Sequence, residues 1–334
     1  MSSASWPPSQ ALGGVFDSDQ SRNALAGANL AYVPYCTSDA YAGDAAASDD
    51  TFGWCGARAA RICHPQPLTG LAPCLLRRRA FRGSHVVPAV LSALASQHGM
   101  GSTGGPERAL LGGCGTGGLG AMLSLDYASE WVPSNVMMHG LLDAALLLDL
   151  APVTAGAAMP LPEQAGALYR LANASGRAWP ECEDTYGGVG ADAWGAWRCI
   201  YGVYRLPFVR VSYLMAQPQY EATQLRADQG GAAPPYAPAS RAAAYAQKFG
   251  QAMRQQLATY PRGDQQGSAV FAPACYAGCL TADGGYFTVR SLFAFALNSF
   301  ALPSRLLRRR RWRCPTPAAR AQPPRWPTRS APGA

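Results

Sequence analysis

The segment that most restricts the fold is a glycine-rich turn at residues 109–119, with the sequence ALLGGCGTGGL. The apolar residues before the turn predict a strand over 108–111, and those after it predict a helix over 119–131. Gly112–Gly118 between them predict a tight connection, because glycine reaches backbone conformations that crowd or strain other residues. A strand that turns sharply into a helix is typical of α/β proteins.

The residues of this turn leave three interpretations open. Gly113, Gly115 and Gly118 satisfy the G-x-G-x-x-G pattern of dinucleotide-binding proteins. That pattern belongs to an opening βαβ unit with an acidic residue about 20 positions later, whereas here the next strand-end acid, Asp143, comes later. The second interpretation is a nucleophile elbow, a strained strand–turn–helix that lifts a nucleophile above the sheet. The third is a connection without chemistry.

The rest of the chain alternates short β-prone runs with amphipathic segments. We expect an irregular loop over 179–198, which contains Cys182 and is followed directly by Cys199. Strands that alternate with helices predict a mostly parallel sheet covered on both faces. The expected strands are 30–35, 136–142, 207–215 and 269–272, and the expected helices are 84–98, 162–173 and 242–260.

The net charge of +8 is concentrated in arginine runs at Arg77–Arg79 and Arg308–Arg311, the second followed by Arg313. Such runs can bind nucleic acid or acidic glycans, but no nucleic-acid motif accompanies them, and a solvated segment is the more common outcome. We expect no nucleic-acid partner. The composition predicts disorder over 1–12 and in the basic, Pro-rich tail at 303–334.

Ten cysteines without zinc-type spacing, and only four histidines, predict neither a metal centre nor a cofactor. An even, scattered set of cysteines fits disulfides in a secreted protein, and Asn173-Ala174-Ser175 is a glycosylation sequon. The first residues have no signal-peptide pattern, and no stretch is apolar enough to span a membrane. We therefore expect either a cytosolic protein or a sequence that lacks its true beginning.

Five segments, in order, resemble the pectin acetylesterase and Notum family of carboxylesterases. The resemblance covers roughly residues 13–290 and implies one α/β-hydrolase-like domain over 13–302, a mostly parallel sheet flanked by helices that lacks its first strands, with an irregular insertion at 55–79. It further implies a secreted or cell-wall esterase that deacylates an O-acylated polysaccharide or protein. The segments are 29–39 (NLAYVPYCTSD), 81–83 (FRG), 110–119 (LLGGCGTGGL, family LLSGCSAGGL), 143–149 (DAALLLD, family DAGFFLD) and 271–279 (FAPACYAGC, family FAPAC and CYAHC).

The family uses a Ser-Asp-His triad, and the resemblance places two of its positions on glycines. The nucleophile position is Gly115 and the base position is Gly278, so this chain lacks both side chains. The acid position is Glu221, because Tyr220–Leu225 (YEATQL) resembles the family pattern Y/F-D-x-x-Q-L; a gapless match would instead give Ala216. Glu221 is otherwise interpreted as a solvated loop carboxylate.

Nearby residues do not replace the missing groups. Cys114 and Thr116 flank the nucleophile position but project differently, and we expect Cys114 in a disulfide or in the core. The family's GGGW-type oxyanion turn does not occur before Asn29. The remaining histidines match no catalytic position; they are His64, His85, His98 and His139.

Three hypotheses follow. The chain is a catalytically inactive family member that binds a glycan, a lipid or another partner; or it still deacetylates polysaccharide through a rearranged site; or it is an interaction protein that acts through its arginine runs. Clean substitutions inside matching motifs favour true divergence, with errors in the gene model superimposed on it that account for the missing first strands, the insertion and the tail. The sequence does not determine the oligomeric state.

Overall fold

The computed structural model describes residues 13–46, except 22 and 24, and residues 80–281, except 154–158, 175–178 and 188–192. The ends predicted to be disordered, the insertion at 55–79 and the arginine runs lie outside the described residues. In chain order the elements are α1 (Val86–Gln97), β1 (Arg108–Cys114), α2 (Thr116–Ala128), β2 (Met137–Asp143), α3 (Leu161–Leu171), α4 (Pro180–Tyr186), α5 (Gly202–Arg205), β3 (Tyr213–Ala216), β4 (Tyr220–Glu221), α6 (Ala222–Asp228), α7 (Arg241–Leu257), β5 (Ala269–Phe271) and β6 (Tyr276–Ala277).

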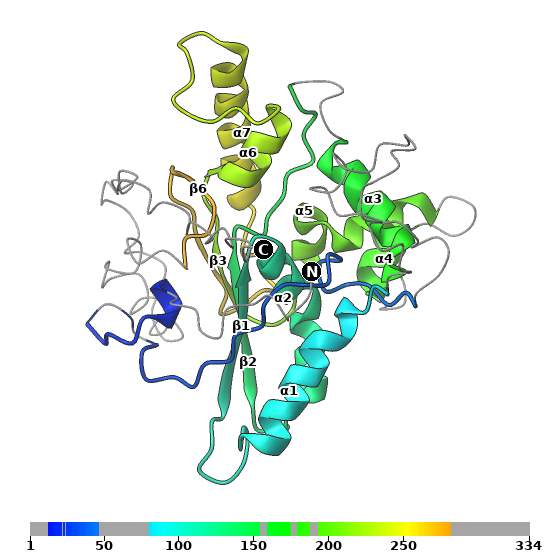
Figure 1. Cartoon of the computed structure of the whole chain (residues 1–334), viewed down its shortest axis with the longest axis vertical. Helices are drawn as coiled ribbons and strands as arrows, with labels where there is room; N and C mark the ends of the chain where they lie inside the picture. Colours follow the sequence, from blue (N-terminus) through cyan, green and yellow to red (C-terminus); the bar gives the residue numbers. More distant parts are fainter. Residues whose placement is uncertain are drawn as a thin grey trace, which may run out of the picture.

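The main sheet has four parallel strands in the order β1-β2-β3-β5 (Figure 1). Its register aligns Cys114 with Asp143, Asp143 with Ala216 and Ala216 with Phe271, so the four carboxyl ends meet at one edge. A second, two-stranded parallel sheet pairs β4 with β6. These pairings confirm the predicted parallel sheet.

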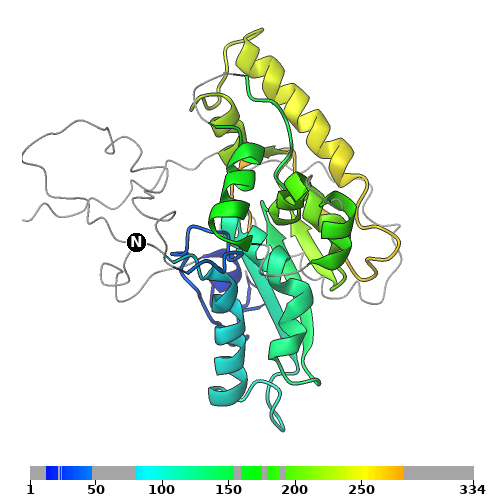
Figure 2. The ribbon, with the colours of Figure 1, turned by 90° about the vertical axis from the view of Figure 1, so that its right-hand side faces the viewer.

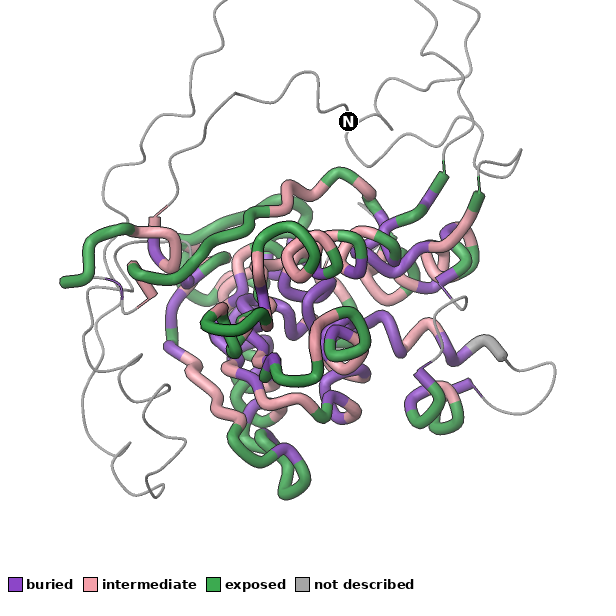
Figure 3. The backbone as a smooth tube through the Cα atoms, turned by 90° about the horizontal axis from the view of Figure 1, so that it is seen from below, coloured by how far each residue is buried: buried purple, intermediate pink, exposed green. Residues whose placement is uncertain are grey.

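Helices α1 and α2 cover one face of the main sheet (Figure 2). Leu111, Leu142 and Met215 point to this face and join the main core with residues of α2, while Met138 packs with Leu91 of α1 in a smaller cluster. Buried residues concentrate in the middle of the molecule and exposed ones at its rim (Figure 3). The helical segments at 84–98, 162–173 and 242–260 are confirmed as α1, α3 and α7.

The strand predicted over 30–35 is wrong. These residues are irregular, and Leu30 and Tyr32 are about half exposed, at 54% and 50%. An extended segment becomes a strand only by pairing its backbone with another strand, and no such pairing to 30–35 occurs among the described residues. Side chains fix its end instead, because the Tyr35 hydroxyl accepts a hydrogen bond from the backbone N–H of Ala40 at 2.8 Å.

Two further predictions need correction. Residues 179–198 are not an irregular loop, because α4 and a 3-10 helix at Ala193–Ile200 occupy the described part and a disulfide joins Cys182 to Cys199. The turn at 112–118 is also narrower than predicted, since β1 runs to Cys114 and α2 begins at Thr116.

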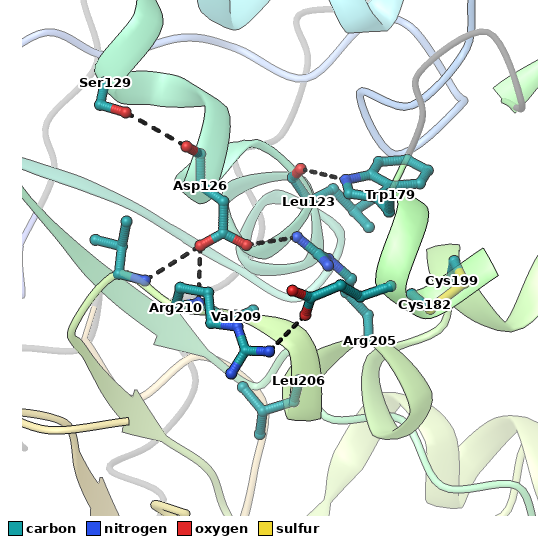
Figure 4. A network of polar contacts seen from close by, with 12 residues as sticks. Leu123, Asp126, Ser129, Trp179, Cys182, Cys199, Arg205, Leu206, Val209 and Arg210 are labelled. Carbon is teal, nitrogen blue, oxygen red and sulfur yellow. Dashed lines mark hydrogen bonds and ion pairs between the residues drawn. A yellow bond between two sulfur atoms is a disulfide. The ribbon is translucent and has the colours of Figure 1, made fainter. Parts of the chain in front are cut away.

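The predicted strand at 207–215 is confirmed only at its end, because β3 begins at Tyr213 and Leu206–Phe208 form a 3-10 turn. The reason is a polar network centred on Asp126 of α2 (Figure 4). Its carboxylate accepts backbone hydrogen bonds from Arg210 and Val211 at 2.8 and 3.1 Å. These two N–H groups therefore bond to a helix side chain and not to a neighbouring strand.

The same carboxylate forms a buried ion pair. The Arg205 guanidinium donates to Asp126 at 2.7 Å, and the Arg205 side chain is only 3% exposed. It lies over the ring of Trp179, whose indole N–H donates to the backbone carbonyl of Leu123 at 3.1 Å. Asp126 thus joins the C-terminal half of α2 to the segment that leads into β3.

We expect Asp126→Asn to lower the free energy of unfolding by about 3–5 kcal/mol, because removing one partner leaves the Arg205 charge buried and uncompensated. Glu181→Gln is the control: Glu181 pairs with Arg210 at the surface, and an exposed pair contributes at most about 1 kcal/mol. Urea unfolding of both variants measures the difference. Equal, small losses would contradict the importance of the buried pair.

Candidate functional site

The glycine turn is a sharp elbow at the carboxyl end of β1. Gly115 connects β1 to α2 with φ 57° and ψ −120°, a positive-φ conformation that residues with a side chain rarely adopt. Its N–H donates to the backbone carbonyl of Asp143 at 2.8 Å, and its carbonyl accepts the N–H of Leu119 at 2.9 Å. A strained residue between a strand and a helix is the geometry of a nucleophile elbow.

Crowding explains some of these glycines but not all. A Cβ at Gly113 would lie 2.9 Å from the amide nitrogen of Gly118, and a Cβ at Gly118 would lie 2.6 Å from the carbonyl oxygen of Asp143. At Gly115 and Gly117, a Cβ would meet no described atom within 4 Å, apart from its own chain neighbours. Only the backbone conformation therefore favours glycine at position 115, and the space for a side chain is open.

A disulfide brings the C-terminal part of the described chain to the elbow. Cys114 is bonded to Cys279, with the two Cα atoms 5.5 Å apart, which confirms the expectation that Cys114 forms a disulfide. Gly278 follows β6 and directly precedes Cys279. Because consecutive Cα atoms are about 3.8 Å apart, Gly115 and Gly278 lie within about 13 Å of each other. A Cβ at Gly278 would also meet no described atom within 4 Å.

Asp143 holds the same two segments together by hydrogen bonds. Its carbonyl bonds to Gly115, and its buried carboxylate accepts the N–H groups of Leu280 and Thr281 at 3.0 and 2.6 Å. The Thr281 hydroxyl donates to the carboxylate as well. Burial raises the pKa of Asp143, while these hydrogen bonds oppose the rise. The sequence placed Asp143 at the end of a strand within DAALLLD but did not indicate this role.

Glu221 lies beside Gly278, the proposed base position. It pairs in register with Ala277, the residue before Gly278, so its Cα is within about 9 Å of that glycine. The side chain is 2% exposed, which contradicts its interpretation as a solvated carboxylate. It accepts the backbone N–H groups of Thr223 and Gln224 at 3.0 and 2.6 Å and thereby caps α6.

Burial raises the pKa of Glu221, which the hydrogen bonds from α6 lower and the charge of Asp143 raises further. Gln224, another residue of the YEATQL segment, also has a structural role. Its side-chain amide accepts the N–H of Leu148 at 2.9 Å and donates to the carbonyl of Leu148 at 2.6 Å. These hydrogen bonds join the YEATQL segment to the DAALLLD segment. Ala216, the alternative acid position, has no polar group in its side chain.

The N-terminal segments approach the same region. The N–H of Val15 donates to the carbonyl of Thr281 at 2.9 Å. Buried Asp39 accepts the N–H of Gly83 at 2.8 Å, and a Cβ at Gly83 would overlap that carboxylate. A glycine is thus required where the FRG segment meets the end of the PYCTSD segment.

The described histidines lie elsewhere. His139 Nδ1 and Ser212 Oγ are 2.8 Å apart, but His139 is four residues before Asp143, toward the amino end of β2. His85 pairs with Asp44 at the surface, and His64 lies outside the described residues. Across residues 13–46 and 80–281, within the gaps given above, no group of three or more His, Cys, Asp or Glu side chains could hold a metal ion. The same residues contain no helix long and apolar enough to cross a membrane.

The arrangement therefore supplies a preformed elbow with room for a Cβ at Gly115, and a buried carboxylate, Glu221, beside Gly278. A positioned nucleophile and base are what ester hydrolysis of the serine type requires. At the two positions that the family resemblance assigns to those side chains, Gly115 and Gly278, the chain has only backbone.

Comparisons with known proteins agree with this geometry. The family model of pectinacetylesterase matches residues 1–294. The palmitoleoyl-protein carboxylesterase NOTUM of Drosophila melanogaster is 26% identical over 314 residues, an alignment that covers 92% of this chain. The chain spans only 39% of the length of that curated relative.

Two crystal forms of the Wnt deacylase Notum from Drosophila have a similar fold. Their TM-scores are 0.65 and 0.64, at 24% and 25% sequence identity, and each match covers 85% of this chain and 70% of the solved chain. The α/β-hydrolase-like fold predicted from the sequence is confirmed.

We expect the Cys114–Cys279 disulfide to stabilise the protein more than Cys182–Cys199, because it closes a chain of 165 residues and not one of 17. Chain-entropy arguments give about 5 and about 3 kcal/mol, respectively. Replacing both cysteines of one pair by alanine, followed by urea unfolding, measures each contribution. A larger loss from the shorter loop would show that local packing, not loop closure, dominates.

Glu221→Gln should change how stability depends on pH. A carboxyl group whose pKa is raised by folding binds more protons in the folded state, so it destabilises the fold as pH rises above its ordinary pKa of 4.5. The variant cannot lose stability in this way. The difference between its free energy of unfolding and that of the parent should therefore increase as pH rises from about 4.5 toward neutrality. A difference that stays constant over this range would exclude a raised pKa at Glu221.

Proposed function

The chain belongs to the pectinacetylesterase family, as its five ordered motifs predicted, and we propose that it is a non-hydrolytic member that binds an acylated ligand. The observation that supports this proposal most directly is the pair of glycines at the elbow and its partner loop. Gly115 and Gly278 stand at the proposed nucleophile and base positions, and a Cβ at either would meet no described atom within 4 Å.

The family's expected activity is deacylation by a carboxylesterase mechanism. A serine would attack the acyl carbon, a histidine would take the serine proton, and a carboxylate would orient the histidine. Of these three groups, this chain keeps only the carboxylate, which is that of Glu221. In serine hydrolases, loss of the nucleophile or the base removes nearly the whole chemical contribution and leaves binding and oxyanion donors.

Binding is the function that this arrangement can still perform. The elbow, the disulfide and the hydrogen bonds of Asp143 keep the carboxyl edge of the sheet assembled. We propose an acylated polysaccharide or acylated protein as the ligand class, since the similar Drosophila protein is named as a palmitoleoyl-protein carboxylesterase. Two disulfides among the described residues support a secreted or cell-wall location.

We expect the absence of a serine at position 115 and of a histidine at position 278 to be sufficient to prevent ester hydrolysis. Purified parent protein should neither react with a fluorophosphonate probe nor hydrolyse p-nitrophenyl acetate. Gly115→Ser combined with Gly278→His should bind the probe at position 115 and raise hydrolysis by about 10²-fold, the lower end of what a positioned base contributes. A serine in the strained elbow conformation should also lower stability by about 1–3 kcal/mol.

The matched control is Gly117→Ser combined with Gly278→His, because position 117 has equally open space but lies in the first turn of α2. It should remain unlabelled. Ser212→Ala identifies any labelling that comes from the Ser212–His139 contact. Hydrolysis by the parent that survives Ser212→Ala and is abolished by Glu221→Gln would overturn the proposal in favour of a rearranged catalytic site.

A further inference from the structure

Asn173 stands in the sequence Asn-Ala-Ser, the sequence that N-linked glycosylation requires. Asn173 and Ala174 are among the described residues, and Ser175 lies outside them. The chain contains five asparagines, and only Asn173 is followed two positions later by serine or threonine. Because a short motif also arises by chance, the position of Asn173 in the fold decides whether the motif can act as an acceptor.

The structure places Asn173 in a turn directly after α3. The N–H of Asn173 donates to the carbonyl of Arg170 at 3.3 Å, and its φ of 50° is the left-handed conformation that asparagine adopts more readily than most residues. The flanking residues, Ala172 and Ala174, are both 0% exposed, whereas Asn173 is exposed. The buried alanines anchor the turn, so the side chain between them projects from the surface.

A contact from the N-terminal segment fixes this turn further. The carbonyl of Ala172 accepts the N–H of Asp44 at 2.8 Å, and a Cβ at Gly43 would lie 3.0 Å from the Ala172 side chain. The packing on the inner side of the turn is thus tight. A large group can be accommodated only on its outer side, where Asn173 is exposed.

The chemistry of the surroundings fits the compartment in which such transfer occurs. The disulfide Cys182–Cys199 lies in the elements that follow this turn, and disulfides form in oxidising compartments such as the endoplasmic reticulum. We infer that Asn173 is an N-glycosylation site. The Nδ2 atom bonds to the first sugar carbon of a lipid-linked diphospho-oligosaccharide, the sugar–phosphate bond breaks, the lipid diphosphate leaves and the amide loses one proton.

This inference does not depend on the proposed function, because a catalytic and a non-catalytic family member would be glycosylated alike. It requires only that the chain enters the secretory pathway. The test therefore contains an internal acceptor that reports this entry. Gln266→Asn creates an Asn-Gly-Ser acceptor in the exposed turn before β5, where 266 and 267 are both exposed.

The full chain carrying Gln266→Asn is expressed behind a secretion leader in a eukaryotic host, and attached glycans are counted by the mobility shift that peptide N-glycosidase removes. The inference predicts two glycans on this chain and on its Ser175→Thr version. It predicts one glycan after Asn173→Gln or Ser175→Ala. Peptide mass spectrometry should find aspartate at position 173 after enzymatic release, because the enzyme converts the glycosylated asparagine to aspartate.

A chain that carries one glycan, at the engineered acceptor alone, would overturn the inference, since it would have reached the transferase with Asn173 unmodified. Two glycans that persist after both Asn173→Gln and Ser175→Ala would also overturn it. Thermal unfolding of the Ser175→Ala chain shows whether the loss of the glycan is accompanied by a change in folding, which the inference does not require.

Discussion

The hydrogen bonds of Asp143 are the constraint on which the candidate site depends. One residue at the end of β2 holds the elbow through its backbone and the 280–281 segment through its carboxylate. A carboxylate buried without such partners would cost several kcal/mol, so the two segments and Asp143 stabilise one another. The disulfide between Cys114 and Cys279 links the same segments covalently. The site is therefore assembled by groups other than those at the three proposed triad positions.

Because the groups that assemble the site differ from those at the proposed triad positions, the fold can keep an elbow that has glycine at position 115. The turn requires very small residues at Gly113 and Gly118, because any side chain there would overlap backbone atoms. At Gly115 the requirement is a positive φ, which glycine meets without the strain that serine would carry. In the proposed assignment, glycine at position 115 thus removes the reactive group and relaxes the backbone at once. A fold that is stable without catalytic side chains is the physical basis of the proposed binding role.

The sequence predicted the features that local patterns determine. The glycine turn, the periodicity of α7 and the ordered motifs were sufficient for the parallel sheet and for the family. The start of β3 could not be predicted, because the carboxylate of Asp126, more than 80 residues away, takes the N–H groups of Arg210 and Val211. The irregular backbone of 30–35 has the same kind of cause, since strand pairing depends on a distant partner and not on local β-propensity.

Glu221 differs from the other two proposed triad positions in having a structural use. Its carboxylate caps α6 through Thr223 and Gln224, and Gln224 in turn holds Leu148. Replacing the acid would leave helix N–H groups unpaired, whereas a Cβ at Gly115 or Gly278 would meet no described atom within 4 Å. In the proposed assignment, the nucleophile and base positions make no contact at Cβ, whereas the acid position caps a helix. A chain released from the need for catalysis would be expected to lose the first two side chains and retain the third, which is the pattern that this sequence shows.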